Sequence, residues 1–231
     1  MKKILLTIEM FLFALSANAE LILVESTTTM ENFWQRNGKT AEKVLTVGRK
    51  IIHDNELRRV PIVLANQNIR NATSNTFDKT VTIYPGLLLY VNNDDELAFI
   101  LGHEIAHSQE AYEGAIKLMA MKFNSKKYEY KSDLKAIDYM VKSGYNPISA
   151  ILIGDKIFEE PLWDWGVFYS HPKGSKRLMA MYEYIYKKYP QYLNSQLAKT
   201  NAFIDFMKQN QKEIASYQQK QAKKNKKMLD L

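Results

Sequence analysis

The feature that most constrains this chain is the segment His103-Glu104-Ile105-Ala106-His107, which lies in an apolar run over residues 97–107. The run favours a helix, and residues four apart on a helix share a face, so both imidazoles can bind one metal ion. Glu104 lies beside that face, where it can reach a water on the metal. These are the groups that zinc-assisted peptide hydrolysis requires. The competing interpretation is an amphipathic helix whose two histidines merely line a groove.

Composition restricts the remaining ligands of such a metal. The chain has no cysteine, which excludes thiolate ligands and disulfides, so a zinc site must use histidine and carboxylate groups. Glu129 and Asp133 lie four residues apart on a helix predicted over residues 125–142. One acid can complete the metal site, and the other can accept a hydrogen bond from a ligand histidine and fix its tautomer. An isolated pair of acids at this spacing is also typical of a solvated helix face.

Length, charge and the N-terminus predict an exported globular protein. At 231 residues, 46% of them hydrophobic, the chain can bury one sizeable core. Its net charge of +7 is mild and no nucleic-acid-binding motif accompanies it, so we expect no nucleic acid partner. Lys2 and Lys3, an apolar stretch over residues 4–15 and the site Ala17-Asn18-Ala19 are typical of a signal peptide. We predict cleavage after residue 19 and a periplasmic location, ahead of full secretion. An uncleaved N-terminal anchor is the alternative.

The pattern along the chain predicts a mainly α-helical α+β fold. Helices are expected over residues 32–55, from the motif to about residue 121, and over 125–142, 148–159, 175–189 and 194–224. Strands are expected over 60–64 and 79–84, with a loop between them over 66–78 that can contain short extended pieces. The polar cluster at residues 92–96 is suited to capping the motif helix. Residues 20–190 form the predicted catalytic domain, and residues 191–231 form a C-terminal helix with a basic tail rich in Lys and Gln.

Several segments resemble, in the same order, a gluzincin family that contains the CAAX prenyl protease, the HtpX-type membrane proteases and soluble periplasmic peptidases. The similar segments span residues 60–180 and are Asn71-Ala72, Val81-Thr82-Ile83-Tyr84-Pro85-Gly86-Leu87-Leu88, residues 95–107, residues 125–133, Ser143-Gly144-Tyr145-Asn146-Pro147 and Ser170-His171-Pro172 with Arg177-Leu178. Three positions depart from the family pattern. Lys126 replaces the usual arginine, Ser132 the usual alanine and Ala136 a frequent glycine.

The resemblance implies a zincin-like metallopeptidase domain that binds one Zn²⁺ ion per chain. It implies that His103, His107 and Glu129 are the metal ligands, that Glu104 is the general base, and that Asp133 orients a ligand histidine. It also gives His171 a role near the metal, either in stabilising the transition state or in capping the zinc in a closed form. His53 has no such context and is expected to be structural or exposed.

Substrate is expected to pair with the edge strand of a small sheet that flanks the active-site helix. We place that edge at the strand near residues 80–84, with Asn71, Ala72, Val81, Thr82 and Ile83 as substrate-binding residues. Backbone pairing reads few side chains, so it suits unfolded or misassembled envelope proteins. The expected activity is therefore a zinc-dependent endopeptidase. A latent or non-catalytic chaperone or adaptor that holds peptides in the same cleft is the alternative.

Two further segments have open interpretations. Trp163 and Trp165 either line the cleft or pack in the core. The basic tail is predicted to be a solvated helix, and peripheral contact with an anionic membrane or an envelope partner is the alternative.

Overall fold

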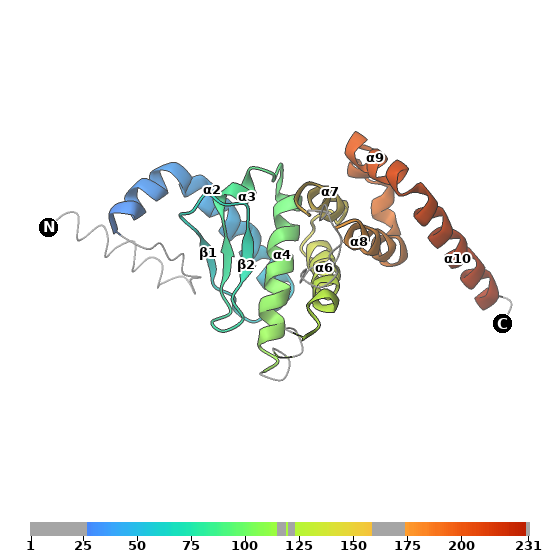
Figure 1. Ribbon diagram of the computed structural model, residues 1–231, viewed down its shortest axis with the longest axis horizontal. Coiled ribbons are helices and arrows are strands. Elements are labelled where there is room, and N and C mark those ends of the chain that lie inside the picture. Colours follow the sequence, from blue (N-terminus) through green and yellow to red (C-terminus); the bar gives the residue numbers. More distant parts are fainter. Residues whose placement is uncertain (1–26, 115–118, 120–122, 159–173, 230–231) are drawn as a thin grey trace.

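The computed structural model describes residues 27–114, 119, 123–158 and 174–229 of the chain. Figure 1 shows a small three-stranded sheet with α2 (Thr27–Asp54) crossing one face and α4 (Asp94–Ala111) running beside it. Beyond α4 lie α6 (Ser125–Lys142), α7 (Ile148–Ile157) and α8 (Gly174–Lys188). The described part of the chain is therefore mainly helical with a small sheet, as predicted. None of its helices has the length and apolar character that a membrane span requires.

The sheet consists of β1 (Ile62–Leu64), β2 (Ala72–Ser74) and β3 (Val81–Ile83), in the order β1-β3-β2. β1 is parallel to β3, and β2 is antiparallel to it. The prediction that the strand near residues 80–84 is the sheet edge is therefore wrong. β3 is the central strand, with a neighbour on each side, and the edge nearest α4 is β2 (Figure 1).

The helix that carries the motif begins as its sequence predicts. Asn93 caps it, since its side chain accepts a hydrogen bond from the Glu96 main-chain N–H at 2.9 Å, and three acids in the first turn favour the positive end of the helix dipole. α4 ends at Ala111, earlier than the predicted residue 121. The chain turns at Tyr112, and Gly114 has a φ of 98°, a left-handed conformation that glycine adopts readily.

α4 and α6 approach each other closely at one glycine. A Cβ atom added to Gly102 would lie 3.3 Å from both Cα and Cβ of Ala136, which is tighter than ordinary van der Waals packing. Gly102 therefore accepts the methyl group that Ala136 presents in place of the frequent family glycine. Gly102 directly precedes His103 on α4, and Ala136 lies seven residues after Glu129 on α6. The close approach of these two residues therefore fixes the spacing of the two helices near the motif.

The C-terminal region is broken into more pieces than the single helix predicted over residues 194–224. Two short 3₁₀ helices, η1 (Pro190–Asn194) and η2 (Leu197–Lys199), precede α9 (Asn201–Gln209) and α10 (Gln211–Leu229). At the break between the last two, the Asn210 side chain donates to the Phe206 carbonyl at 2.9 Å. The break lets Phe206 on α9 and Ile214 on α10 both be buried in the hydrophobic core.

Candidate metal centre

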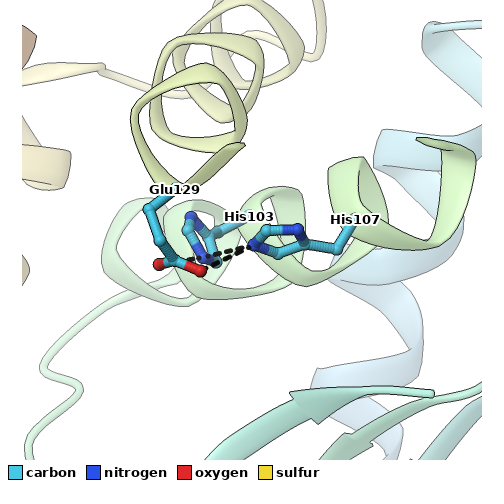
Figure 2. A group of neighbouring side chains, drawn as sticks. All are labelled: His103, His107 and Glu129. Atoms are coloured by element: carbon cyan, nitrogen blue, oxygen red, sulfur yellow. Dashed lines mark hydrogen bonds and ion pairs between the residues drawn. The ribbon is translucent and has the colours of Figure 1, made fainter. Parts of the chain in front are cut away.

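Three side chains from two helices converge between α4 and α6. Figure 2 shows His103 and His107 projecting from α4 toward Glu129 on α6. The Nε2 atoms of the two histidines are 3.2 Å apart. Glu129 Oε1 lies 3.3 Å from His107 Nε2, and Glu129 Oε2 lies 3.5 Å from His103 Nε2. The two motif histidines and the predicted third ligand are thus brought together.

These distances fit a tetrahedral zinc ion. Two ligand atoms that each lie about 2.0–2.1 Å from such an ion are about 3.3–3.4 Å apart. The 3.2 Å between the two histidines and the 3.3 Å from Glu129 Oε1 to His107 Nε2 are close to this value, and the 3.5 Å to His103 Nε2 is measured from the other oxygen, Oε2. Each side chain is 10–14% exposed, so the donors are largely buried but retain some contact with solvent. Two imidazoles and one carboxylate are a zinc donor set that leaves a coordination position open for water or substrate. His103, His107 and Glu129 would hold the metal.

Asp133 lies behind the first histidine. Its Oδ1 is 2.9 Å from His103 Nδ1, and its side chain is 1% exposed. Burial disfavours the charged imidazolium, but hydrogen bonding and attraction from Asp133 and Glu129 outweigh it and raise the pKa of His103 to about 10. Without a metal, His103 is therefore protonated at neutral pH, and it must release that proton to become a ligand.

Arg177 on α8 joins the same group of carboxylates. Its Nε and one terminal nitrogen donate to the two Asp133 oxygens at 2.7 and 2.6 Å, and its other terminal nitrogen is 3.2 Å from Glu129 Oε2. Burial opposes the charge of this guanidinium, but Asp133, Glu129 and Glu104 together raise its pKa above the ordinary value. Arg177 is therefore positive, and the electrostatic influence of Glu104 on it shows that this half-buried acid lies near the same group.

The second histidine has its own neighbour on α6. Ser132 Oγ lies 3.3 Å from His107 Nδ1, and the serine is fully buried. With Nε2 facing the metal position, Nδ1 carries the proton and can donate to this hydroxyl. Ser132, which replaces the usual family alanine, therefore supports the second ligand much as Asp133 supports the first.

The other predicted site residues have different outcomes. Ala72 lies on the edge strand β2, and Asn71 directly precedes it. Val81, Thr82 and Ile83 form the central strand and have no free backbone edge for a substrate. The exposed His53 lies 2.9 Å from its neighbour Asp54, near the end of α2 and far in sequence from the metal ligands. His171, Trp163 and Trp165 lie outside the described residues, as does the predicted signal peptide.

Sequence reasoning missed the contacts of Arg177 and Ser132. In the sequence, Arg177 stands out only as part of a similar segment, and Ser132 only as a departure from one. The position of Ser132, directly before Asp133 and three residues after Glu129, is the signal that places it on the neighbouring part of the same helix face. No local pattern links Arg177 to Asp133, because 44 residues separate them.

Comparison with known proteins agrees with this geometry. The family model of peptidase family M48 matches residues 38–119, which include α4 with both histidines and Glu104. The match ends before Glu129 and covers less than half of the chain. It supports membership of this metallopeptidase family. No curated protein and no solved structure matched the chain.

Proposed function

We propose that this chain is a zinc-dependent endopeptidase. The observation that carries the proposal is the convergence of His103, His107 and Glu129. The two Nε2 atoms are 3.2 Å apart, and each lies 3.3 or 3.5 Å from one of the two Glu129 oxygens. The M48 family match over the motif helix supports the same chemistry. When bound, zinc would supply Lewis acidity, which lowers the pKa of a water and polarises the peptide carbonyl.

The residues of the chain then have separate roles. Glu104 takes the proton of the attacking water and returns it to the leaving amine, which is general base and then general acid catalysis by one carboxylate. Asp133 keeps the Nδ1 proton of His103 directed toward itself, so that Nε2 remains a donor. The same alignment on His107 comes from Ser132. The family resemblance gives His171 one of two roles, either stabilising the oxyanion of the transition state or capping the zinc in a closed form.

The substrate is proposed to bind as an added strand on β2. Hydrogen bonds from Tyr84 N to Asn71 O and from Asn75 N to Thr80 O set the antiparallel register, in which Thr73 faces Thr82. Alternate residues of an antiparallel strand direct their main-chain groups to opposite sides, so Ala72 and Ser74 direct theirs away from β3. Within the described structure no strand pairs with that side of β2. Pairing there recognises the main chain of the substrate rather than particular side chains, which supports unfolded or misassembled envelope proteins as the substrate class.

The test is cleavage of an unfolded protein such as casein by zinc-loaded protein and by its Glu104→Gln variant. We expect Glu104→Gln to retain about one zinc per chain but lose turnover by about 10²–10⁴-fold, the usual contribution of a general base. Glu113→Gln makes the same chemical change at an exposed residue just after α4 and should leave turnover unchanged.

The outcomes separate the two candidate functions. Cleavage by the parent and by Glu113→Gln, but not by Glu104→Gln, would establish the protease. Parent protein that binds zinc and retains unfolded peptide without cleaving it would overturn the protease in favour of a latent or peptide-holding protein. Turnover that survives in Glu104→Gln would remove the general-base role.

A further inference from the structure

Arg177 is the residue that connects the supporting carboxylate to the ligand carboxylate. Its three guanidinium nitrogens are distributed over two acids, two to Asp133 at 2.7 and 2.6 Å and one to Glu129 Oε2 at 3.2 Å. The side chain is only 8% exposed, and its guanidinium carbon lies 3.9 Å from the ring centroid of Phe158. A planar, buried and fully engaged guanidinium has little freedom, so it fixes the orientation of both carboxylates.

The two oxygens of Glu129 are thereby placed in different surroundings. Oε2 lies 3.2 Å from the positively charged Arg177 and 3.5 Å from His103 Nε2, while Oε1 lies 3.3 Å from His107 Nε2. A carboxylate that binds zinc through both oxygens would fill a position that a catalytic site must leave open for water. An arginine that holds one oxygen opposes that second bond.

We propose that Arg177 is a positioning residue that keeps Glu129 a ligand through a single oxygen and keeps the Asp133 carboxylate oriented beneath His103. The proposal rests on the zinc site of the proposed function and adds to it a residue that does not touch metal or substrate. Arg177 acts through both acids at once, so its loss should alter the coordination of the metal as well as its affinity.

Charge balance supports the same role. Glu104, Glu129 and Asp133 place three negative charges around the site, and all three interact with Arg177. With both histidines neutral, the guanidinium and a Zn²⁺ ion together supply three positive charges. Without Arg177 the site would hold an excess negative charge.

The chain provides a matched control on the same two helices. Lys188 on α8 pairs with Asp138 on α6 at 2.8 Å, and it also contacts the hydroxyl of Tyr184 at 2.9 Å. Replacing this lysine removes an α6–α8 ion pair outside the metal ligands. A role of Arg177 that consisted only of joining α8 to α6 would be reproduced by the loss of Lys188.

The experiment compares the full chain with Arg177→Met, Arg177→Lys and Lys188→Met. Zinc affinity is measured by competition with a chromophoric chelator, coordination by the visible spectrum of the Co²⁺-substituted protein, and folding by thermal unfolding. Arg177→Met should bind zinc about 10–100-fold more weakly, the usual effect of losing a residue that orients a ligand. Its Co²⁺ bands should weaken, since higher coordination numbers give less intense bands. Lys188→Met should keep the parent's zinc affinity and Co²⁺ spectrum, whatever its unfolding temperature.

Arg177→Lys keeps the charge but loses the planar group that reaches two acids, so we expect zinc affinity between those of the parent and Arg177→Met. This variant also decides the question if Arg177→Met does not fold. Parent-like zinc affinity and Co²⁺ spectrum in folded Arg177→Lys would overturn the proposal, as would equal effects of Arg177→Met and Lys188→Met. None of these measurements uses turnover. A parent that binds zinc but cleaves nothing would therefore overturn the protease and leave the role of Arg177 standing.

Discussion

His103 and Asp133 are joined across two helices, with Nδ1 of the histidine 2.9 Å from Oδ1 of the aspartate. This contact assigns the two nitrogens of the ring to different tasks. Nδ1 faces the buried carboxylate, and Nε2 lies 3.2 Å from its counterpart on His107, at the metal position. The same carboxylate strengthens the histidine as a ligand and, when no metal is bound, holds a second proton on it.

Zinc binding should therefore release a proton. The pKa of His103 is raised to about 10, so the metal-free ring is protonated through the neutral range, whereas the ligand form has Nε2 free. Zinc affinity should increase with pH below that value. Isothermal titration at pH 7 in buffers of different ionisation enthalpy should report about one proton released per zinc.

A control for this prediction is Asp133→Asn, which removes one of the two acids that raise the pKa of His103. It should release fewer protons at pH 7 and bind zinc more weakly, because the ligand loses its charged partner. A heat of binding that is the same in every buffer for the parent would contradict the raised pKa of His103.

Ser132→Ala should lower zinc affinity slightly. The change restores the usual family residue but removes the hydroxyl 3.3 Å from His107 Nδ1. A neutral hydrogen bond contributes about 0.5–1.5 kcal/mol, which corresponds to roughly 2–13-fold in affinity, and the long distance favours the lower end. Ser149→Ala is a matched control, since that buried hydroxyl on α7 has no hydrogen-bond partner in the described structure. Equal zinc affinities for Ser132→Ala and the parent would show that the hydroxyl does not support the ligand.

Gly102→Ala should destabilise the protein and weaken the metal site together. The new methyl would meet Ala136 at 3.3 Å from both its Cα and its Cβ, and a helix backbone yields less easily than a side chain. Overpacking of this kind costs about 1–3 kcal/mol in the free energy of unfolding. Chemical denaturation measures that cost, and chelator competition measures the accompanying change in zinc affinity.

The double variant Gly102→Ala with Ala136→Gly moves the methyl to the other helix and should recover part of both losses. No recovery would indicate that the backbone of α6, rather than the Ala136 methyl, sets the spacing of the two helices.

Ala72→Pro should raise KM for extended peptides while zinc affinity stays unchanged. Proline removes one main-chain N–H that faces away from β3, without removing a β2–β3 hydrogen bond. Ala72→Ser keeps the N–H and is the matched control. A KM that is equal in Ala72→Pro and Ala72→Ser would place substrate elsewhere. A substrate with N-methylated amides near the cleaved bond tests the same pairing from the other strand.

The last prediction concerns the basic face of α10, for which we propose weak adsorption to anionic membranes. Lys212, Lys220, Lys223 and Lys224 are exposed, whereas Ile214 on the same helix is buried. Each lysine near such a surface contributes about 1 kcal/mol at low salt, and salt screens the attraction.

Sedimentation with phosphatidylserine vesicles should detect binding that disappears at high ionic strength. Deletion of residues 219–231 should abolish it and spares the Tyr217 hydroxyl, which donates to Glu183 O at 3.2 Å. Binding that survives the deletion, or is absent throughout, would leave α10 a solvated helix.

The sequence predicts those parts of the site that depend on helical spacing. His103 and His107 are four residues apart on one helix, and Glu129 and Asp133 are four apart on another, so each pair shares a face in any context. The resemblance then distinguishes the two acids, and in the structure Glu129 faces both histidines while Asp133 meets only the first. α6 has the predicted bounds of residues 125–142 because Lys142 precedes the Ser143-Gly144 turn, where glycine has a φ of 76°.

The parts that escaped prediction depend on contacts between distant segments. β2 is three residues long within a stretch rich in Asn and Thr, so the sequence lacks the alternation of apolar and polar residues from which a strand is predicted. Its pairing with β3 makes β3 the central strand, and this reversed the predicted edge. Likewise, Arg177 carries no signal of its own. Its partners become apparent only when α8 packs against α6.

Because the proposed ligands come from both α4 and α6, a bound metal ion would cross-link the two helices. Residues 112–124 are all that connects the two helices in sequence, and an ion held by His103, His107 and Glu129 would fasten them a second time. A ligand that binds only the native state adds about 2.7 kcal/mol of stability at one hundred times its Kd. The free energy of unfolding would then depend on the concentration of free zinc around the protein. Scarcity of the metal would then lower the stability of the folded chain in addition to emptying the proposed site.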